Sequence, residues 1–113
     1  MADGRQRPGE TPELRRLRRR IDSLDRKLVA LLNERAVLAR EAGRAKTAAG
    51  RTAIRDAERE REVLLRVSIA NEGPMPQPDL LAMYRRLFVA TRALEARDRE
   101  RDRAHMERGD EPT

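Results

Sequence analysis

Cations and acids recur at helical spacing in three stretches of this sequence, and their side chains could do chemistry. In the first stretch, Arg35 and Lys46 are eleven residues apart. On a helix, eleven steps bring both side chains to the same side, about 16 Å apart along the axis. Two cations placed in this way can converge on an anion that lies between them. Arg18 would lie about 25 Å from Arg35 on the same straight helix, so it could join this site only from a neighbouring chain.

The second and third stretches add acids and a hydroxyl group. Asp56, Arg59 and Glu60 follow the i, i+3, i+4 pattern and therefore share one helix surface. In the third stretch, an apolar stripe continues at the same spacing into Thr91 and Glu95. Buried polar groups need partners, and a cluster of them inside a helical bundle is typical of a ligand site.

Each of these residues also has a purely structural interpretation. A lone arginine in an apolar seam, such as Arg35, often sets register or extends its charge to solvent. Lys46 near a helix C-terminus can simply complement the helix dipole. The charges of the second stretch could form an exposed ion-pair network, and the polar residues of the third could mark the end of a buried face. Singly, each structural interpretation is favoured, but together these residues favour a binding site.

The elements that must position these residues are helices. Thr11 and Pro12 form a typical helix start, and no proline follows until after Gly50, which predicts one helix over 12–49. Such a helix would be about 57 Å long, which is longer than any compact domain this chain could form alone. We therefore expect it to pack against a second copy of itself.

Two shorter helices are expected after the first. One should start near 52–54 and end near Ala70, before the proline-rich segment 71–78. Asp79 is then expected to cap a third helix whose buried stripe extends to Leu94. Past Arg97 the charged sequence can stay helical for a few turns but has nothing to bury. We found no β alternation, so the predicted fold is all-α. The expected organisation is a disordered tail over 1–10, a helical domain over 11–97 and a charged tail over 98–113.

The composition limits the classes of function. The chain is 41% charged and 2% aromatic, so its core is thin and aliphatic, and oligomerisation is a usual remedy for so short a chain. It contains no cysteine, which excludes disulfides and thiolate chemistry. No apolar run or leader-like segment predicts a membrane association, so a cytoplasmic location is expected. The net charge of +6 is spread among interspersed acids, which is more typical of solvated helix faces than of a nucleic-acid surface.

Three motifs in order resemble the all-helical chorismate mutases. They are LRRRIDSLDRKLVALLNERAVLAREAGRAK, IRDAEREREVL and YRRLFVATRALE, and the similarity covers roughly residues 13 to 97. The resemblance implies an intertwined homodimer of three-helix chains whose active sites are shared between protomers. It implies the Claisen rearrangement of chorismate, a dianion, to prephenate in phenylalanine and tyrosine biosynthesis. No cofactor, metal or covalent intermediate is implied.

The resemblance also implies a role for each candidate residue. Substrate carboxylates would bind Arg35, the partner's Arg18 and Thr91, with support from Arg59. The substrate hydroxyl would bind Glu60 and the backbone near Asp56. Lys46 and Glu95 would donate to the ether oxygen, on which negative charge develops. Because an ionised carboxylate cannot donate, we expect Glu95 to act in its protonated form and activity to fall as the pH rises.

Several alternatives stay open at this stage. Related proteins of the same fold act as isochorismate–pyruvate lyases or rearrange 4-amino-4-deoxychorismate, and the Asp56 and Glu60 pair favours chorismate only moderately. A basic helical dimer that binds nucleic acid or another protein is a second class, although so few aromatic residues argue against base stacking. A weak mutase that depends on a separate partner enzyme of the aromatic pathway is a third.

Overall fold

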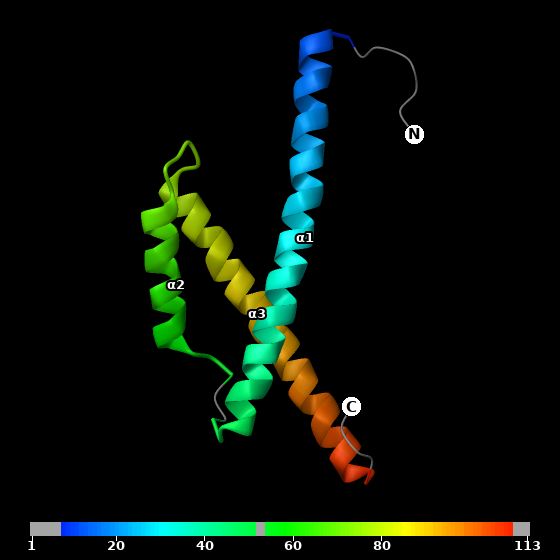
Figure 1. The fold of residues 1–113 in the computed structure, drawn as a ribbon, viewed down its shortest axis with the longest axis vertical. Helices are drawn as coiled ribbons and strands as arrows, with labels where there is room; N and C mark the ends of the chain where they lie inside the picture. Colours follow the sequence, from blue (N-terminus) through cyan, green and yellow to red (C-terminus); the bar gives the residue numbers. More distant parts are fainter. Residues whose placement is uncertain (1–7, 52–53, 110–113) are drawn as a thin grey trace. The chain divides into compact units, whose positions relative to one another are not determined.

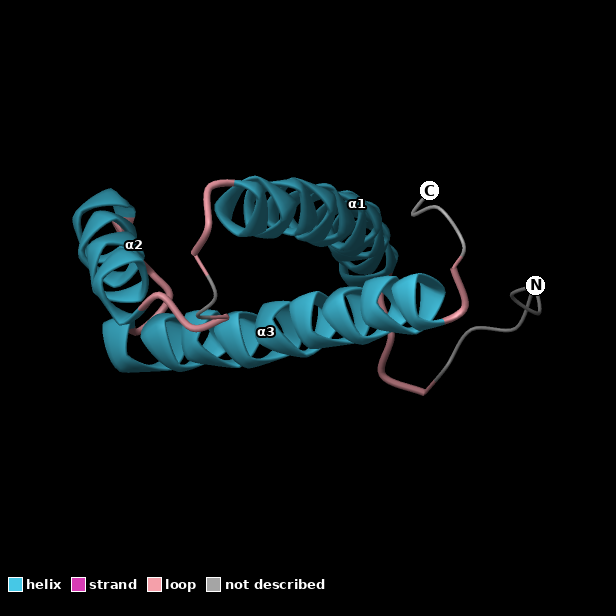
Figure 2. Ribbon diagram, turned by 90° about the horizontal axis from the view of Figure 1, so that it is seen from below, coloured by secondary structure: helices cyan, strands magenta, loops and turns pink. Residues whose placement is uncertain are grey.

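The computed structural model describes residues 8–51 and 54–109, and these residues form three α-helices joined by turns and loops (Figures 1 and 2). Helix α1 spans Pro12–Ala48, α2 spans Ala57–Ala70 and α3 spans Gln77–Glu107. The chain divides into two compact units, residues 1–36 and residues 37–113, and α1 contributes to both. The prediction of an all-α fold with a long first helix is therefore confirmed.

Helix α1 begins where the sequence predicts. The hydroxyl oxygen of Thr11 accepts a hydrogen bond from the backbone N–H of Leu14 at 3.1 Å, as an N-cap residue does. Pro12 is the first helical residue, where its missing N–H costs nothing, and Glu13 places an acid in the first turn.

Helix α1 ends in a Schellman motif. The N–H of Arg51 donates to the carbonyl of Lys46 at 2.9 Å, and the N–H of Gly50 donates to Thr47 at 3.0 Å. This motif requires a left-handed backbone at the residue after the C-cap, and Gly50 has a φ of +83°. Gly50 thus closes the first helix.

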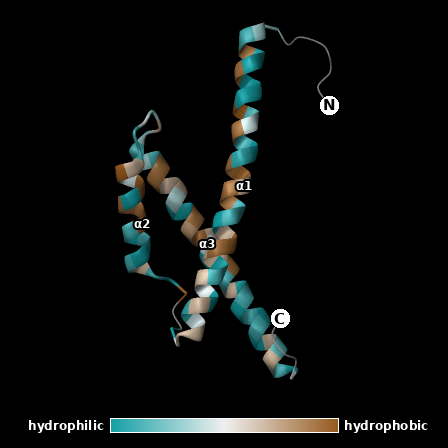
Figure 3. Ribbon diagram, viewed as in Figure 1, coloured by the Kyte–Doolittle hydropathy of each residue, from teal (hydrophilic) through white to brown (hydrophobic). Residues whose placement is uncertain are grey.

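The first unit carries an apolar stripe that is exposed in this chain. The stripe runs at intervals along α1 (Figure 3), and its members include Leu17, Ile21, Leu24, Leu28 and Leu31. Large exposed apolar surfaces of this kind mark interaction sites.

Helix α2 begins later than expected. We predicted a start near residues 52–54, but the first helical residue is Ala57, and residue 52 lies outside the described part of the chain. The reason is Asp56, whose side chain accepts from the backbone N–H of Arg59 at 3.0 Å and thereby caps the helix. Asp56, which is predicted as a site residue, therefore also caps α2.

Helix α3 differs from the prediction at its start. Asp79 is not its cap, because the helix already begins at Gln77 after an extended Pro76. Pro78 is suited to the first turn, where its missing N–H and fixed φ favour a helix start, and it leaves Asp79 as the acid of that turn. At the other end the helix continues past Arg97 to Glu107, in agreement with the few further turns that the sequence allows.

The second unit has a small apolar core between α2 and α3. The two helices pack side by side, with α2 against the N-terminal half of α3 (Figures 1 and 2). Phe88 on α3 is 7% exposed, and its ring contacts that of Tyr84 edge-on with 6.4 Å between the centroids. This core packs α2 against the helix that carries Thr91 and Glu95.

Candidate active site

The second unit brings Lys46 of α1 and Glu95 of α3 together, although the two residues are far apart in sequence. The Nζ atom of Lys46 lies 3.9 Å from Oε2 of Glu95. Glu95 is 8% exposed, which is rare for a glutamate. The pair therefore places a cationic donor and a buried carboxyl group where α1 meets α3.

A glycine on α1 allows this close approach. A Cβ atom at Gly43 would lie 3.1 Å from Cδ and 3.2 Å from Cγ of Glu95, which is tighter than ordinary van der Waals contact. Gly43 is itself buried, so α3 lays the Glu95 side chain directly on the α1 backbone.

One turn further along α3, a bidentate ion pair joins the same two helices. Arg40 donates from Nε and from Nη2 to the two carboxylate oxygens of Asp98, both at 2.9 Å. Asp98 is 6% exposed, and its pKa is lowered chiefly by the hydrogen bonds from Arg40. The expectation that the sequence beyond Arg97 has nothing to bury is therefore wrong. The physical reason is that a buried carboxylate is tolerated when an arginine satisfies both of its oxygens.

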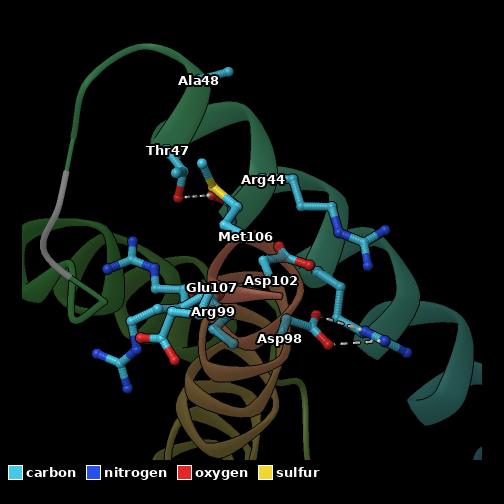
Figure 4. A pocket seen from close by; sticks show the side chains of 12 residues that line it. Arg44, Thr47, Ala48, Asp98, Arg99, Asp102, Met106 and Glu107 are labelled. Carbon is cyan, nitrogen blue, oxygen red and sulfur yellow. Dashed lines mark hydrogen bonds and ion pairs between the residues drawn. The ribbon is translucent and has the colours of Figure 1, made fainter. Parts of the chain in front are cut away.

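A cavity of about 740 Å³ opens beside these contacts, between the last turns of α1 and the C-terminal half of α3 (Figure 4). Its lining includes Gly43 and Glu95, and also the Arg40–Asp98 pair. Figure 4 shows that the residues around it are mostly charged, with Met106 among them.

Helix α2 supplies the acids predicted for the substrate hydroxyl. Asp56 lies at its N-terminus, where the pKa of the carboxyl group is lowered first by the backbone N–H of Arg59 and then by the side chain of Arg51. The charge of Lys46 lowers the pKa of Asp56 further, which relates Asp56 electrostatically to the Lys46–Glu95 pair.

The guanidinium group of Arg59 forms an exposed ion pair with Glu62 at 3.2 Å, one turn along α2. In this structure the contribution of Arg59 is its backbone N–H, which Asp56 accepts.

Glu60 is held by an arginine that the sequence analysis missed. Arg92 of α3 donates to Oε2 of Glu60 at 2.5 Å, and both side chains are part-buried. Arg55 approaches the other oxygen, Oε1, at 3.6 Å. A signal for Arg92 was present in the sequence, because it follows Thr91 directly and lies four residues after the buried Phe88.

The other predicted residues lie as follows. Thr91 is half-buried on α3, in the second unit. Arg18 and Arg35 belong to the first unit, where Arg35 is half-buried and Arg18 pairs with Glu10 at 2.7 Å. The structure thus brings Lys46 and Glu95 together, and it holds Glu60 against α3.

Neither a membrane span nor a metal cluster is found in the described part of the chain. Over 8–51 and 54–109, no helix combines the length and the hydropathy that a membrane span needs. Within the same residues, we found no group of three or more His, Cys, Asp or Glu side chains arranged to hold a metal ion.

Comparisons with known proteins agree on one family. The family model described as chorismate mutase type II matches residues 17–96. A bifunctional chorismate mutase/prephenate dehydratase of Stutzerimonas stutzeri is 37% identical over 90 residues, which cover 76% of this chain and 25% of that protein. The corresponding protein of Aquifex aeolicus is 39% identical over 87 residues, which cover 74% of this chain and 24% of that protein. This chain therefore spans about a quarter of the length of these relatives.

A solved structure is also similar. The chorismate mutase (form II) of Thermus thermophilus superposes with a TM-score of 0.71 at 33% identity. The match covers 75% of this chain and 96% of that one.

Proposed function

This chain belongs to the chorismate mutase type II family, and we propose that it catalyses the rearrangement of chorismate to prephenate. The observation that carries this proposal is the contact between Lys46 and the buried Glu95, because both were predicted as donors to the ether oxygen. Prephenate leads to phenylalanine and tyrosine, so the proposed role is in aromatic amino acid biosynthesis, and the proposed location is the cytoplasm.

The proposed mechanism needs only binding, orientation and charge stabilisation. The reaction is intramolecular, so holding chorismate in its compact conformer supplies much of the rate. As the ether C–O bond breaks, negative charge grows on the ether oxygen. Lys46 donates to that oxygen from one side, and Glu95 is the second proposed donor to it. Donors that strengthen as charge develops stabilise the transition state more than the substrate.

The remaining predicted residues would bind the substrate. Arg35 and the partner's Arg18 are proposed to hold carboxylates, since a guanidinium group can bind both oxygens of one carboxylate. Thr91 would add a hydrogen bond to a carboxylate, and Arg59 would support it or the site wall. Glu60 and the backbone near Asp56 would hold the ring hydroxyl.

We propose that the active form is an intertwined homodimer. The support comes from the apolar stripe along α1, which is exposed in the single chain although its members would be favoured inside a core. A second copy that covers this stripe would also bring its own Arg18 to the site. Catalysis would then require the dimer, because each site would need Arg18 from the partner.

The test is direct. The purified protein is mixed with chorismate, the loss of chorismate absorbance is followed, and the product is identified by mass and by its acid-catalysed conversion to phenylpyruvate. Prephenate as the product supports the proposal, and pyruvate with an aromatic acid would instead indicate a lyase. No turnover, with or without an added synthase or dehydratase of the aromatic pathway, would refute the proposed activity and leave only the family and fold.

A further inference from the structure

We infer that Arg92 is a positioning residue that fixes Glu60 so that one carboxylate oxygen is presented to the ring hydroxyl of the substrate. This inference rests on the proposed function, and it goes further by naming a residue that controls recognition of the hydroxyl. It starts from the contact between the Nη1 atom of Arg92 and Oε2 of Glu60, which measures 2.5 Å.

The contact joins two helices that carry different parts of the site. Glu60 belongs to α2 and Arg92 to α3, and the two residues are 32 positions apart in sequence. The Glu60 side chain is 16% exposed and that of Arg92 is 27% exposed. A charge-assisted hydrogen bond in such a part-buried setting is stronger and more directional than an exposed ion pair.

The geometry leaves the second oxygen of Glu60 for a ligand. Oε2 is taken by Arg92, whereas the contact to Oε1 is an ion pair with the exposed Arg55 at 3.6 Å. That distance is longer than a hydrogen bond, so Oε1 keeps its capacity to accept one. A hydroxyl group that donates to Oε1 would therefore meet an oxygen whose orientation is already fixed, which reduces the entropy lost on binding.

Both residues also line a common cavity of about 280 Å³ between α2 and α3. Its charged lining consists of Glu60 and four arginines, Arg55, Arg61, Arg85 and Arg92. Glu60 is therefore reached from this cavity between arginines of both helices. Among these arginines, Arg92 makes the hydrogen bond to Glu60.

The decisive experiment compares two substrates that differ in one group. Chorismate and its 4-deoxy analogue carry the same two carboxylates, but only chorismate has the ring hydroxyl. We expect Arg92→Gln to lower kcat/KM for chorismate by roughly ten- to a hundredfold, the range for losing a hydrogen bond to a charged group. For the deoxy analogue we expect a change of less than about threefold, because the interaction that Arg92 supports is then absent.

Two further variants separate positioning from folding. Arg92→Lys keeps the charge and should restore part of the preference for chorismate over the deoxy analogue. The double variant Glu60→Gln, Arg92→Gln should lose little more kcat/KM for chorismate than either single variant. Arg86→Gln is the matched control, because Arg86 is an exposed arginine on the same helix and does not line this cavity. Circular dichroism of each variant confirms that α-helix content is kept.

The outcomes are distinct. Equal losses for both substrates would mean that Arg92 acts on a carboxylate or on the fold, and they would overturn the inference while the proposed function stands. Unchanged activity of Arg92→Gln on chorismate would overturn it as well. If the wild-type protein turns over neither substrate, the proposed function fails and this inference fails with it.

Discussion

Glu95 of α3 lies directly on the backbone of α1 at Gly43, where a Cβ atom would come within 3.1 Å of its carboxyl carbon. This contact sets how closely the two helices approach at the candidate site. It also places the Glu95 carboxyl group 3.9 Å from the ammonium group of Lys46. The positions of the two proposed donors to the ether oxygen thus depend on the absence of a side chain at Gly43.

Gly43→Ala is therefore expected to impair activity more than stability. The added methyl group should displace Glu95 by a few tenths of an ångström or more, and we expect kcat/KM for chorismate to fall roughly tenfold. Alanine also favours the helix over glycine by about 1 kcal/mol, which offsets part of the steric cost in the free energy of unfolding. Steady-state kinetics and urea unfolding measure the two effects separately.

The control for this prediction is Glu41→Ala, an exposed change on the same part of α1. It alters helix propensity but should leave kcat/KM unchanged. If Gly43→Ala keeps full activity, the contact between Gly43 and Glu95 does not position a reacting group.

Glu95→Gln and Glu95→Ala together test whether residue 95 donates to the ether oxygen. An amide donates a hydrogen bond, whereas a methyl group cannot. We expect Glu95→Gln to keep activity on chorismate and Glu95→Ala to lower kcat/KM roughly a hundredfold. Steady-state kinetics of both variants checks this, and equal activity of the two would show that residue 95 donates to no reacting atom.

Mixing two inactive variants tests the shared active site. Arg18→Ala and Lys46→Ala should each lose most activity as homodimers, since each lacks a cation at both sites. A heterodimer of the two contains one site with both residues intact if Arg18 comes from the partner. After the mixture is unfolded and refolded, about a quarter of the wild-type activity should therefore return. Native mass spectrometry shows whether mixed dimers form. If they form and no activity returns, Arg18 either serves the site of its own chain or lies outside the active site.

Asp98 should contribute to the pH dependence of stability. Its pKa in the folded chain is lowered by Arg40, so the unfolded chain binds more protons in the acid range. The stabilisation is fully present above the unfolded pKa, about 3.9, and is lost as the pH falls through the lower folded value. We expect the free energy of unfolding to fall with decreasing pH, and less steeply in Asp98→Asn.

Urea unfolding of both proteins between about pH 6 and pH 2.5 measures this difference. Asp22→Asn, an exposed change on α1, serves as the control and should leave the slope unchanged. Asp56, whose pKa is also lowered, should leave a residual slope in every variant. Equal slopes for wild type and Asp98→Asn would mean that the Arg40 pair does not stabilise the fold.

The sequence by itself determined the helices and most candidate residues. Local rules were sufficient for α1, because a threonine cap, a first-turn proline and a closing glycine act within a few residues of each helix end. Spacing favoured a binding site that includes Lys46 and Glu95, and their roles as donors were implied by the resemblance of three motifs. The starts of α2 and α3 were less well predicted, because sequence spacing did not show that Asp56 caps α2 or that α3 already begins at Gln77, before Pro78.

Only the tertiary structure decided which distant charges meet. Glu60 with Arg92, and Arg40 with Asp98, are 32 and 58 residues apart, and no periodicity within one helix relates them. The burial of Asp98 depends on an arginine from another helix, so a charged sequence past Arg97 could be interpreted as solvated until the packing was known. The physical reason is that a buried charge is tolerated only where an opposite charge pairs with it, and the fold decides which distant residues come into contact.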